Sequence, residues 1–166
     1  MGIDIIMIFA AAGLALLYAL ANGSKVLGSD PGNQAMQNIA LAIQEGAKAY
    51  LNRQYQTIAI VGIVITAFLS IAMAWYVALG FVIGAVLSAV AGYIGMYVSV
   101  RANVRTAEAA RTGLAKALNI SFSAGAITGL LVVGLGLMGL AGFFFYLQHI
   151  NLEQRQVLEA LVALSF

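Results

Sequence analysis

Residues 54–100, QYQTIAIVGIVITAFLSIAMAWYVALGFVIGAVLSAVAGYIGMYVSV, are forty-seven consecutive residues without a charged side chain. A helix needs about twenty apolar residues to cross the hydrocarbon core of a bilayer, so a single span cannot use this run. Two helices joined by a tight turn can use it. Trp75 suits the membrane interface and Gly80 provides a bend, so we expect spans near residues 58–76 and 81–100.

The composition of the whole chain also indicates a membrane protein. Of the 166 residues, 63% are hydrophobic and only 8% are charged, whereas about a quarter of the residues of a soluble domain are charged. The net charge of +2 is too small for a nucleic-acid-binding protein, whose affinity comes mainly from phosphate neutralisation. Because the chain has no cysteine, disulfides, a thiolate nucleophile and cysteine-ligated metals are excluded.

Charge-free runs on either side of this stretch predict two further spans. The run that begins at Ile5 predicts a first span over residues 5–21, and no basic residue precedes it, which favours a retained span over a cleaved signal. The run over residues 117–152 predicts a fourth span over 124–147.

The last ten residues, VLEALVALSF, have the character of a fifth helix that begins at about residue 157. Ten residues cannot cross a bilayer, so we expect that the chain is a fragment cut inside its fifth helix. The alternative is a short tail that lies at the membrane interface.

The segment between the first two spans, residues 22–56, predicts a turn followed by an amphipathic helix. Asp30-Pro31-Gly32 is a turn signal, and Asn33 can cap a helix over residues 33–55. At 100° per residue one face of this helix is apolar and the other is polar. The apolar face carries Met36, Ile39, Ala40, Ile43, Ala47 and Tyr50, and the polar face carries Gln37, Asn38, Gln44, Glu45, Lys48 and Asn52.

The distribution of lysine and arginine predicts the orientation. Seven of the eight lie in the links 22–56 and 101–122, and Arg155 alone follows the fourth span. The positive-inside rule therefore places both links in the cytoplasm and the N-terminus outside. The expected fold class is an all-α polytopic bundle with four complete transmembrane helices and the start of a fifth.

Small residues recur at intervals of four in the third and fourth spans. They are Gly80, Gly84, Ser88 and Gly92 in the third span, and Gly125 and Gly129 in the fourth. In a bilayer this spacing lets helix backbones approach closely, because packing replaces the hydrophobic effect as the attractive force. The pattern predicts a packed bundle rather than isolated helices.

The chain offers no recognisable catalytic or metal-binding set, so we assign no catalytic, cofactor-binding or metal-binding residue. None of the four spans carries an ionisable residue in its middle, where ion pathways usually have one. Glu159, near the start of the fifth helix, and the single histidine, His149, are expected to be interfacial. No group of carboxylates is suited to Mg²⁺.

The stretch RANVRTAEAARTGLAK, residues 101–116, holds half of the positive charge of the chain. On a continuous helix its charged residues share one side, where Arg105/Glu108 and Glu108/Arg111 form i,i+3 pairs. This side is either a solvated face that fixes topology and attracts anionic headgroups, or a phosphate-binding edge. Charge alone favours the first interpretation.

Two segments resemble the N-terminal part of membrane-integral pyrophosphatases. They are GNQAMQNIALAIQEGAKAYLNRQYQTIAIVGIVI and GAVLSAVAGYIGMYVSVRANVRTAEAARTGLAKALNISFSAGAITGLLVVGLGL, residues 32–65 and 84–137. The resemblance implies part of a homodimeric ion pump that couples hydrolysis of pyrophosphate, bound with Mg²⁺, to ion transport in the bacterial inner membrane. Within that family, the sequence is most similar to those of bacterial K⁺-independent proton pumps.

The resemblance also implies that different helices of a longer protein have different roles. The first four helices of the family belong to an outer ring, and the motifs that bind Mg-pyrophosphate lie on later helices, beyond Phe166. The expected partners are therefore the lipid bilayer and the remaining helices of the pump, and this segment alone should be inactive. The alternative is a free-standing four-span scaffold or assembly protein.

Overall fold

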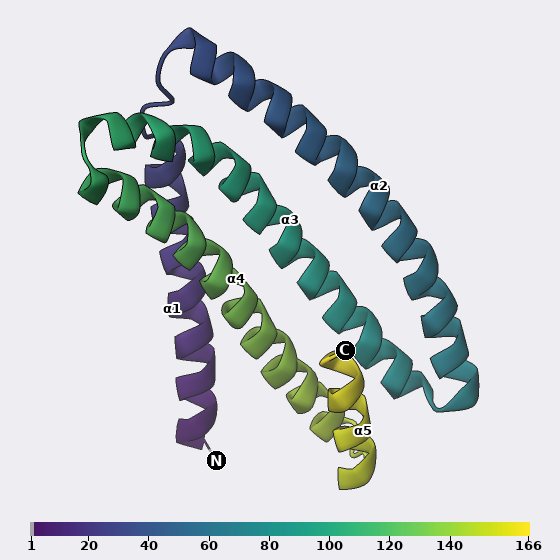
Figure 1. The fold of residues 1–166 in the computed structure, drawn as a ribbon. Coiled ribbons are helices and arrows are strands. Elements are labelled where there is room, and N and C mark those ends of the chain that lie inside the picture. The colour runs from purple at the N-terminus through teal and green to yellow at the C-terminus, as the bar shows by residue number, and fades with distance from the viewer. Residues whose placement is uncertain (1) are drawn as a thin grey trace.

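The computed structural model describes residues 2–166, and these form five helices connected by short turns (Figure 1). The helices are α1 (Gly2–Leu27), α2 (Gln34–Ala72), α3 (Trp75–Thr112), α4 (Leu114–His149) and α5 (Gln154–Leu164). The first four are long and apolar enough to cross a membrane. The predicted class, an all-α polytopic bundle with four membrane helices and a short fifth, is confirmed.

The four long helices lie side by side in the order α1, α4, α3, α2, and consecutive helices of the chain run in opposite directions (Figure 1). The C-terminal end of α1, the N-terminal end of α2 and the α3–α4 turn meet at one end of the bundle, which we name the basic end. The α2–α3 turn and α5 lie at the opposite end, where α5 packs against α3 and α4.

The second membrane helix differs from the prediction. The expected amphipathic helix 33–55 and span 58–76 form a single helix, α2, of 39 residues. The turn that follows comes at Met73 and Ala74, not near Gly80, so the expected third span 81–100 is only the middle of α3. The residues at the turn include no proline or glycine, and the Met73 N–H still bonds the Leu69 carbonyl. No local sequence feature therefore predicts a turn at this position.

The predicted link 101–122 is helical on both sides of one glycine. Gly113 has φ +149°, a backbone conformation that L side chains rarely adopt, and it separates α3 from α4. The charged stretch 101–116 is therefore divided between two helices that fold back on each other. The fifth helix begins at Gln154 instead of residue 157, because the Glu153 N–H bonds the Gln156 side chain in a capping box.

Two clusters form the core. One joins α1, α3 and α4 near the basic end, and the other joins α4 to α5 near the opposite end. The buried residues of the first are Ala19, Val26, Val98, Ala102, Ala124, Ile127 and Leu131; those of the second are Phe143, Leu147, Val157, Ala160 and Leu164. Helix α2 belongs to neither cluster and has only two buried residues, Ala40 and Leu51.

The face that α2 turns toward α3 is rotated from the predicted apolar face. Ile39 and Tyr50 are 64% and 62% exposed, whereas Gln37 and Gln44, assigned to the polar face, are half-buried. The Gln37 side chain is satisfied there, because its amide nitrogen donates to the Gly32 carbonyl at 2.7 Å. The face of α2 that contacts α3 therefore does not follow from hydrophobicity alone, because a polar side chain with a local hydrogen-bond partner can lie on that face.

The small-residue pattern predicts the close helix contacts of α3, but on α4 the close contacts occur at other glycines than those predicted. A Cβ added to Gly80 or Gly84 would collide with the carbonyl oxygen of Ala160 or Leu164 in α5. No neighbouring atom lies within 4 Å of a Cβ added to Gly125 or Gly129, so those two glycines make no close helix contact within residues 2–166. Close packing on α4 occurs instead at Gly134, beside α1, and at Gly139, beside α3.

Candidate functional site

The polar side chains of the described chain gather mainly at the basic end, around Arg105 of α3. The Arg105 guanidinium donates three hydrogen bonds to backbone carbonyls. Its Nη2 reaches the Leu27 oxygen at 2.6 Å, its Nε the Ser29 oxygen at 3.1 Å, and its Nη1 the Arg101 oxygen at 2.7 Å. Two of these bonds cross to the end of α1, about seventy-five residues earlier in the chain.

These bonds explain how α1 ends. The last carbonyls of a helix have no partner within it and carry partial negative charge. Leu27 is the last residue of α1, and a half-buried guanidinium supplies both the missing donor and the complementary charge. Arg105 therefore joins the C-terminal end of α1 to α3.

The α1–α2 link is held by its own side chains beside this arginine. The Gly32 N–H donates to Asp30 Oδ1 at 2.8 Å, and the Met36 N–H donates to Asn33 Oδ1 at 3.0 Å. The predicted turn and the predicted N-cap at Asn33 are both confirmed. Gly32 has φ +79°, and Glu108 Oε2 lies so near that an added Cβ would meet it at 2.8 Å.

A hollow of about 590 Å³ opens between the link and the α3–α4 hairpin. Its polar lining comes from Asp30, Arg105, Glu108, Thr112, Lys116 and Asn119. The lining of the hollow carries both positive and negative side chains, and some of them are already bonded. Arg105 donates to backbone carbonyls, and Glu108 Oε2 pairs with Arg111 Nη1 at 3.3 Å. Of the two i,i+3 pairs predicted here, only Glu108/Arg111 forms, because the carbonyls of α1 take the guanidinium of Arg105.

This end of the molecule has the groups to hold helices together, but it lacks a set suited to Mg²⁺. Among the side chains that the structure describes, those of residues 5–166, no three from His, Asp or Glu lie close enough to share a metal ion. Asp30 and Glu108 are the two carboxylates of the hollow, and two cations lie beside them. Because cations lie beside both carboxylates and no further carboxylate lines the hollow, we assign no Mg²⁺ site there.

The two titratable residues singled out near the opposite end lie at the bundle surface. Glu159 of α5 accepts a hydrogen bond from Arg155 Nε at 3.0 Å, one helical turn away. His149, the last residue of α4, is exposed. Neither lies in the middle of a membrane-spanning helix.

Sequence reasoning missed two polar contacts between helices. One is the capping of α1 by Arg105, and the other is the Tyr55 hydroxyl, which donates to the Ala89 carbonyl of α3 at 3.0 Å. Tyr55 also packs edge-on against Tyr93, with ring centroids 6.0 Å apart. The sequence feature that relates to the second contact is the glycine at position 92, because the Tyr55 hydroxyl lies 2.8 Å from where a Cβ would be at that residue.

Comparison with known proteins gives a consistent result over nearly the whole chain. The family described as inorganic H⁺ pyrophosphatase matches residues 13–166. A K⁺-insensitive pyrophosphate-energized proton pump of Methanosarcina mazei is 48% identical over 143 residues, which cover 83% of this chain. Proton pump 2 of the same description from Moorella thermoacetica is 48% identical over 133 residues, or 80% of the chain.

A relative that is described as a sodium pump is also similar. A putative K⁺-stimulated pyrophosphate-energized sodium pump of Clostridium tetani is 42% identical over 117 residues, or 70% of the chain. The matches cover 21%, 20% and 17% of these three relatives. The chain thus spans about a fifth of the length of the pumps that it matches.

Proposed function

The chain belongs to the inorganic H⁺ pyrophosphatase family, and we propose that it forms the N-terminal membrane module of a pyrophosphate-energised proton pump. The observation that carries the proposal is the match over residues 13–166. The proton pumps of Methanosarcina mazei and Moorella thermoacetica, at 48% identity, favour protons over sodium as the pumped ion.

In this proposal the module is structural. Its four membrane helices pack beside the helices that hold Mg²⁺ and pyrophosphate, and they supply no group to the hydrolysis itself. The remaining helices of the pump and a second subunit are the proposed protein partners.

The proposed orientation places the basic end in the cytoplasm. Lysine and arginine residues that flank membrane helices are retained on the cytoplasmic side, and seven of the eight cations lie in segments 22–56 and 101–122, on the basic-end side of the apolar parts of the helices. The N-terminus and α5 would then lie toward the outside. A bacterial inner membrane is the proposed location.

A chimera tests the proposal directly. Residues 13–166 replace the matching segment of the Methanosarcina mazei pump, and inverted membrane vesicles are assayed for pyrophosphate hydrolysis and for proton uptake. We expect both activities in the chimera, because the hydrolytic groups come from the remainder of the host pump. The host pump without the segment, and this chain by itself, should show neither.

The two readouts separate the parts of the proposal. Hydrolysis without proton uptake would contradict a role in a coupled pump, and a correctly inserted chimera without hydrolysis would contradict the family role. Pyrophosphate hydrolysis by residues 1–166 alone would contradict the structural assignment. A free-standing scaffold predicts an inactive chimera and a stable, inserted chain.

A further inference from the structure

A small cavity between α2 and α3 is flanked by two cations that have no acidic partner. It encloses about 180 Å³ and is lined by Gln44, Lys48 and Leu51 of α2 and by Tyr93, Tyr97 and Arg101 of α3. It differs from the hollow around Arg105, because no carboxylate lines it. Its charge is therefore purely positive.

Arg101 is held in place without its charge being neutralised. Its guanidinium carbon lies 3.5 Å from the centroid of the Tyr97 ring, and its Nη1 donates to the Tyr97 carbonyl at 3.2 Å. A guanidinium stacked on an aromatic face keeps its other N–H groups free for an oxyanion. The tyrosine thus fixes the position of the cation beside the cavity.

Lys48 lies across the cavity from Arg101, on the neighbouring helix. It is exposed, and its side chain forms no hydrogen bond or salt bridge with the described side chains, those of residues 5–166, although Glu45 lies one turn earlier. A lysine and an arginine on two different helices, both unpaired, form a ready site for one anionic group.

The cavity lies at the depth of a membrane interface. Residues 54–72 of α2 and 75–100 of α3 carry no charge, so the cations stand just beyond the apolar parts of both helices. Eighteen residues separate Trp75 from Tyr93, which is about 27 Å along a helix. The hydrocarbon core is about 30 Å thick, so Trp75 and Tyr93 mark its two boundaries.

The same pair of helices offers an apolar surface below the cations. A second, larger cavity of about 460 Å³ opens between the charge-free parts of α2 and α3, and its lining is almost entirely apolar. Its residues include Ile58, Gly62 and Ile65 of α2 and Phe81 and Ala85 of α3. The pair therefore combines a cationic site at the interface with an apolar cleft in the hydrocarbon layer.

We propose that α2 and α3 bind one anionic phospholipid, whose phosphate contacts Lys48 and Arg101 and whose acyl chains lie along the apolar parts of the two helices. Basic pockets between membrane helices are suited to anionic headgroups, and each nearby cation strengthens such binding about fivefold. A zwitterionic lipid carries a choline or ethanolamine cation that the two basic side chains repel. The site therefore selects lipids with net negative charge.

The test measures lipid retention by the protein purified in detergent. Native mass spectrometry follows binding of dioleoylphosphatidylglycerol, of dioleoylphosphatidylcholine and of inorganic phosphate. We expect phosphatidylglycerol to bind at least about tenfold more tightly than phosphatidylcholine, and we expect Lys48→Gln with Arg101→Gln to remove most of that difference. Lys48→Gln alone, which removes an exposed cation without a bonded partner, should weaken phosphatidylglycerol binding about fivefold.

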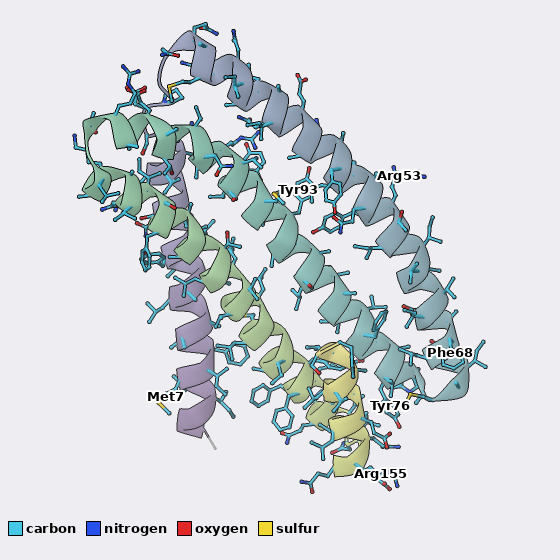
Figure 2. The ribbon with its side chains drawn as sticks, in the orientation of Figure 1. Met7, Arg53, Phe68, Tyr76, Tyr93 and Arg155 are labelled. Atoms are coloured by element: carbon cyan, nitrogen blue, oxygen red, sulfur yellow. The ribbon has the colours of Figure 1, made fainter. Side chains whose placement is uncertain are left out.

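A matched control has the same change of charge elsewhere. Lys25→Gln with Arg53→Gln also removes one lysine and one arginine, and Arg53 points away from α3 (Figure 2). This control should keep phosphatidylglycerol binding within about twofold of the unaltered protein. Equal losses in both double variants would show diffuse attraction and overturn the site. Equal binding of both lipids, or displacement of phosphatidylglycerol by inorganic phosphate, would overturn the assignment to a lipid.

Discussion

Helices α2 and α4 are alike in length and in the hydropathy of their apolar stretches, and they differ in how they pack. They have 39 and 36 residues, and their most apolar stretches have mean hydropathies of 2.0 and 2.2. Yet 28% of that stretch of α4 is buried within the protein, and none of that of α2 is. Helix α4 is packed by α1, α3 and α5, whereas α2 packs against no described helix other than α3.

The difference shows that hydropathy and packing are separate properties in a bilayer. Lipid covers an apolar side chain as well as protein does, so hydropathy predicts a span without predicting a neighbour. Contacts instead follow glycines and polar side chains that meet a partner. Gly134 and Gly139 of α4 receive Leu16 and Leu87, whereas Gly46 and Gly62 of α2 have no neighbouring atom within 4 Å of an added Cβ.

The strongest way to test this contrast is to add bulk at a packed and at an open glycine. Gly84→Leu should lower the free energy of unfolding by about 3 kcal/mol, because the new side chain meets the backbone carbonyl of Leu164 and α5 must move. The change is measured by titration with SDS, followed by the fluorescence of Trp75, the single tryptophan.

The matched control for that substitution is Gly62→Leu on α2. It adds the same side chain to a position with open space, so stability should change little. If both variants lose the same stability, the packed and open faces are not distinct, and the contrast between the helices fails.

The next largest effect is expected at the basic end. Arg105→Ala removes three hydrogen bonds and leaves the Leu27 and Ser29 carbonyls without this donor, which should cost about 2 kcal/mol. Hydrogen exchange of the last turn of α1 should accelerate, because that turn loses its cap. The control is Arg53→Ala on α2, because the Arg53 side chain forms no hydrogen bond within the described part of the chain, and exchange of α1 should stay unchanged. Faster exchange of α1 in both variants would contradict the role of Arg105.

A smaller effect tests the side-chain hydrogen bond between α2 and α3. Tyr55→Phe keeps the ring but removes the bond to the Ala89 carbonyl, and it should cost about 1 kcal/mol. Tyr50→Phe, at a tyrosine that is 62% exposed, serves as the control. Hydrogen exchange of α2 should increase only in the Tyr55 variant; unchanged exchange would mean that the hydroxyl does not hold the two helices together.

The sequence predicted the spans better than the connections, for a physical reason. The absence of charge over residues 54–100 requires two helices, whatever their neighbours are. The turn at Met73 has no proline or glycine to predict it, and the role of Arg105 depends on where α1 ends in space. Neither can be read from a local pattern, and both had to come from the structure.

The smallest predicted effect has the opposite sign and distinguishes the helices most simply. Gly46→Ala on α2 adds a methyl group at an exposed position with open space and ordinary helical backbone, so it meets no strain. Alanine loses less backbone entropy than glycine when a helix forms, and the substitution should raise the free energy of unfolding by about 0.5–1 kcal/mol. Gly80→Ala on α3 makes the same change where the Ala160 carbonyl blocks the methyl group, and it should lower stability. The two are compared by SDS titration; a loss of stability in both would show that α2 has a close partner at Gly46, because only contact there can reverse the entropic gain.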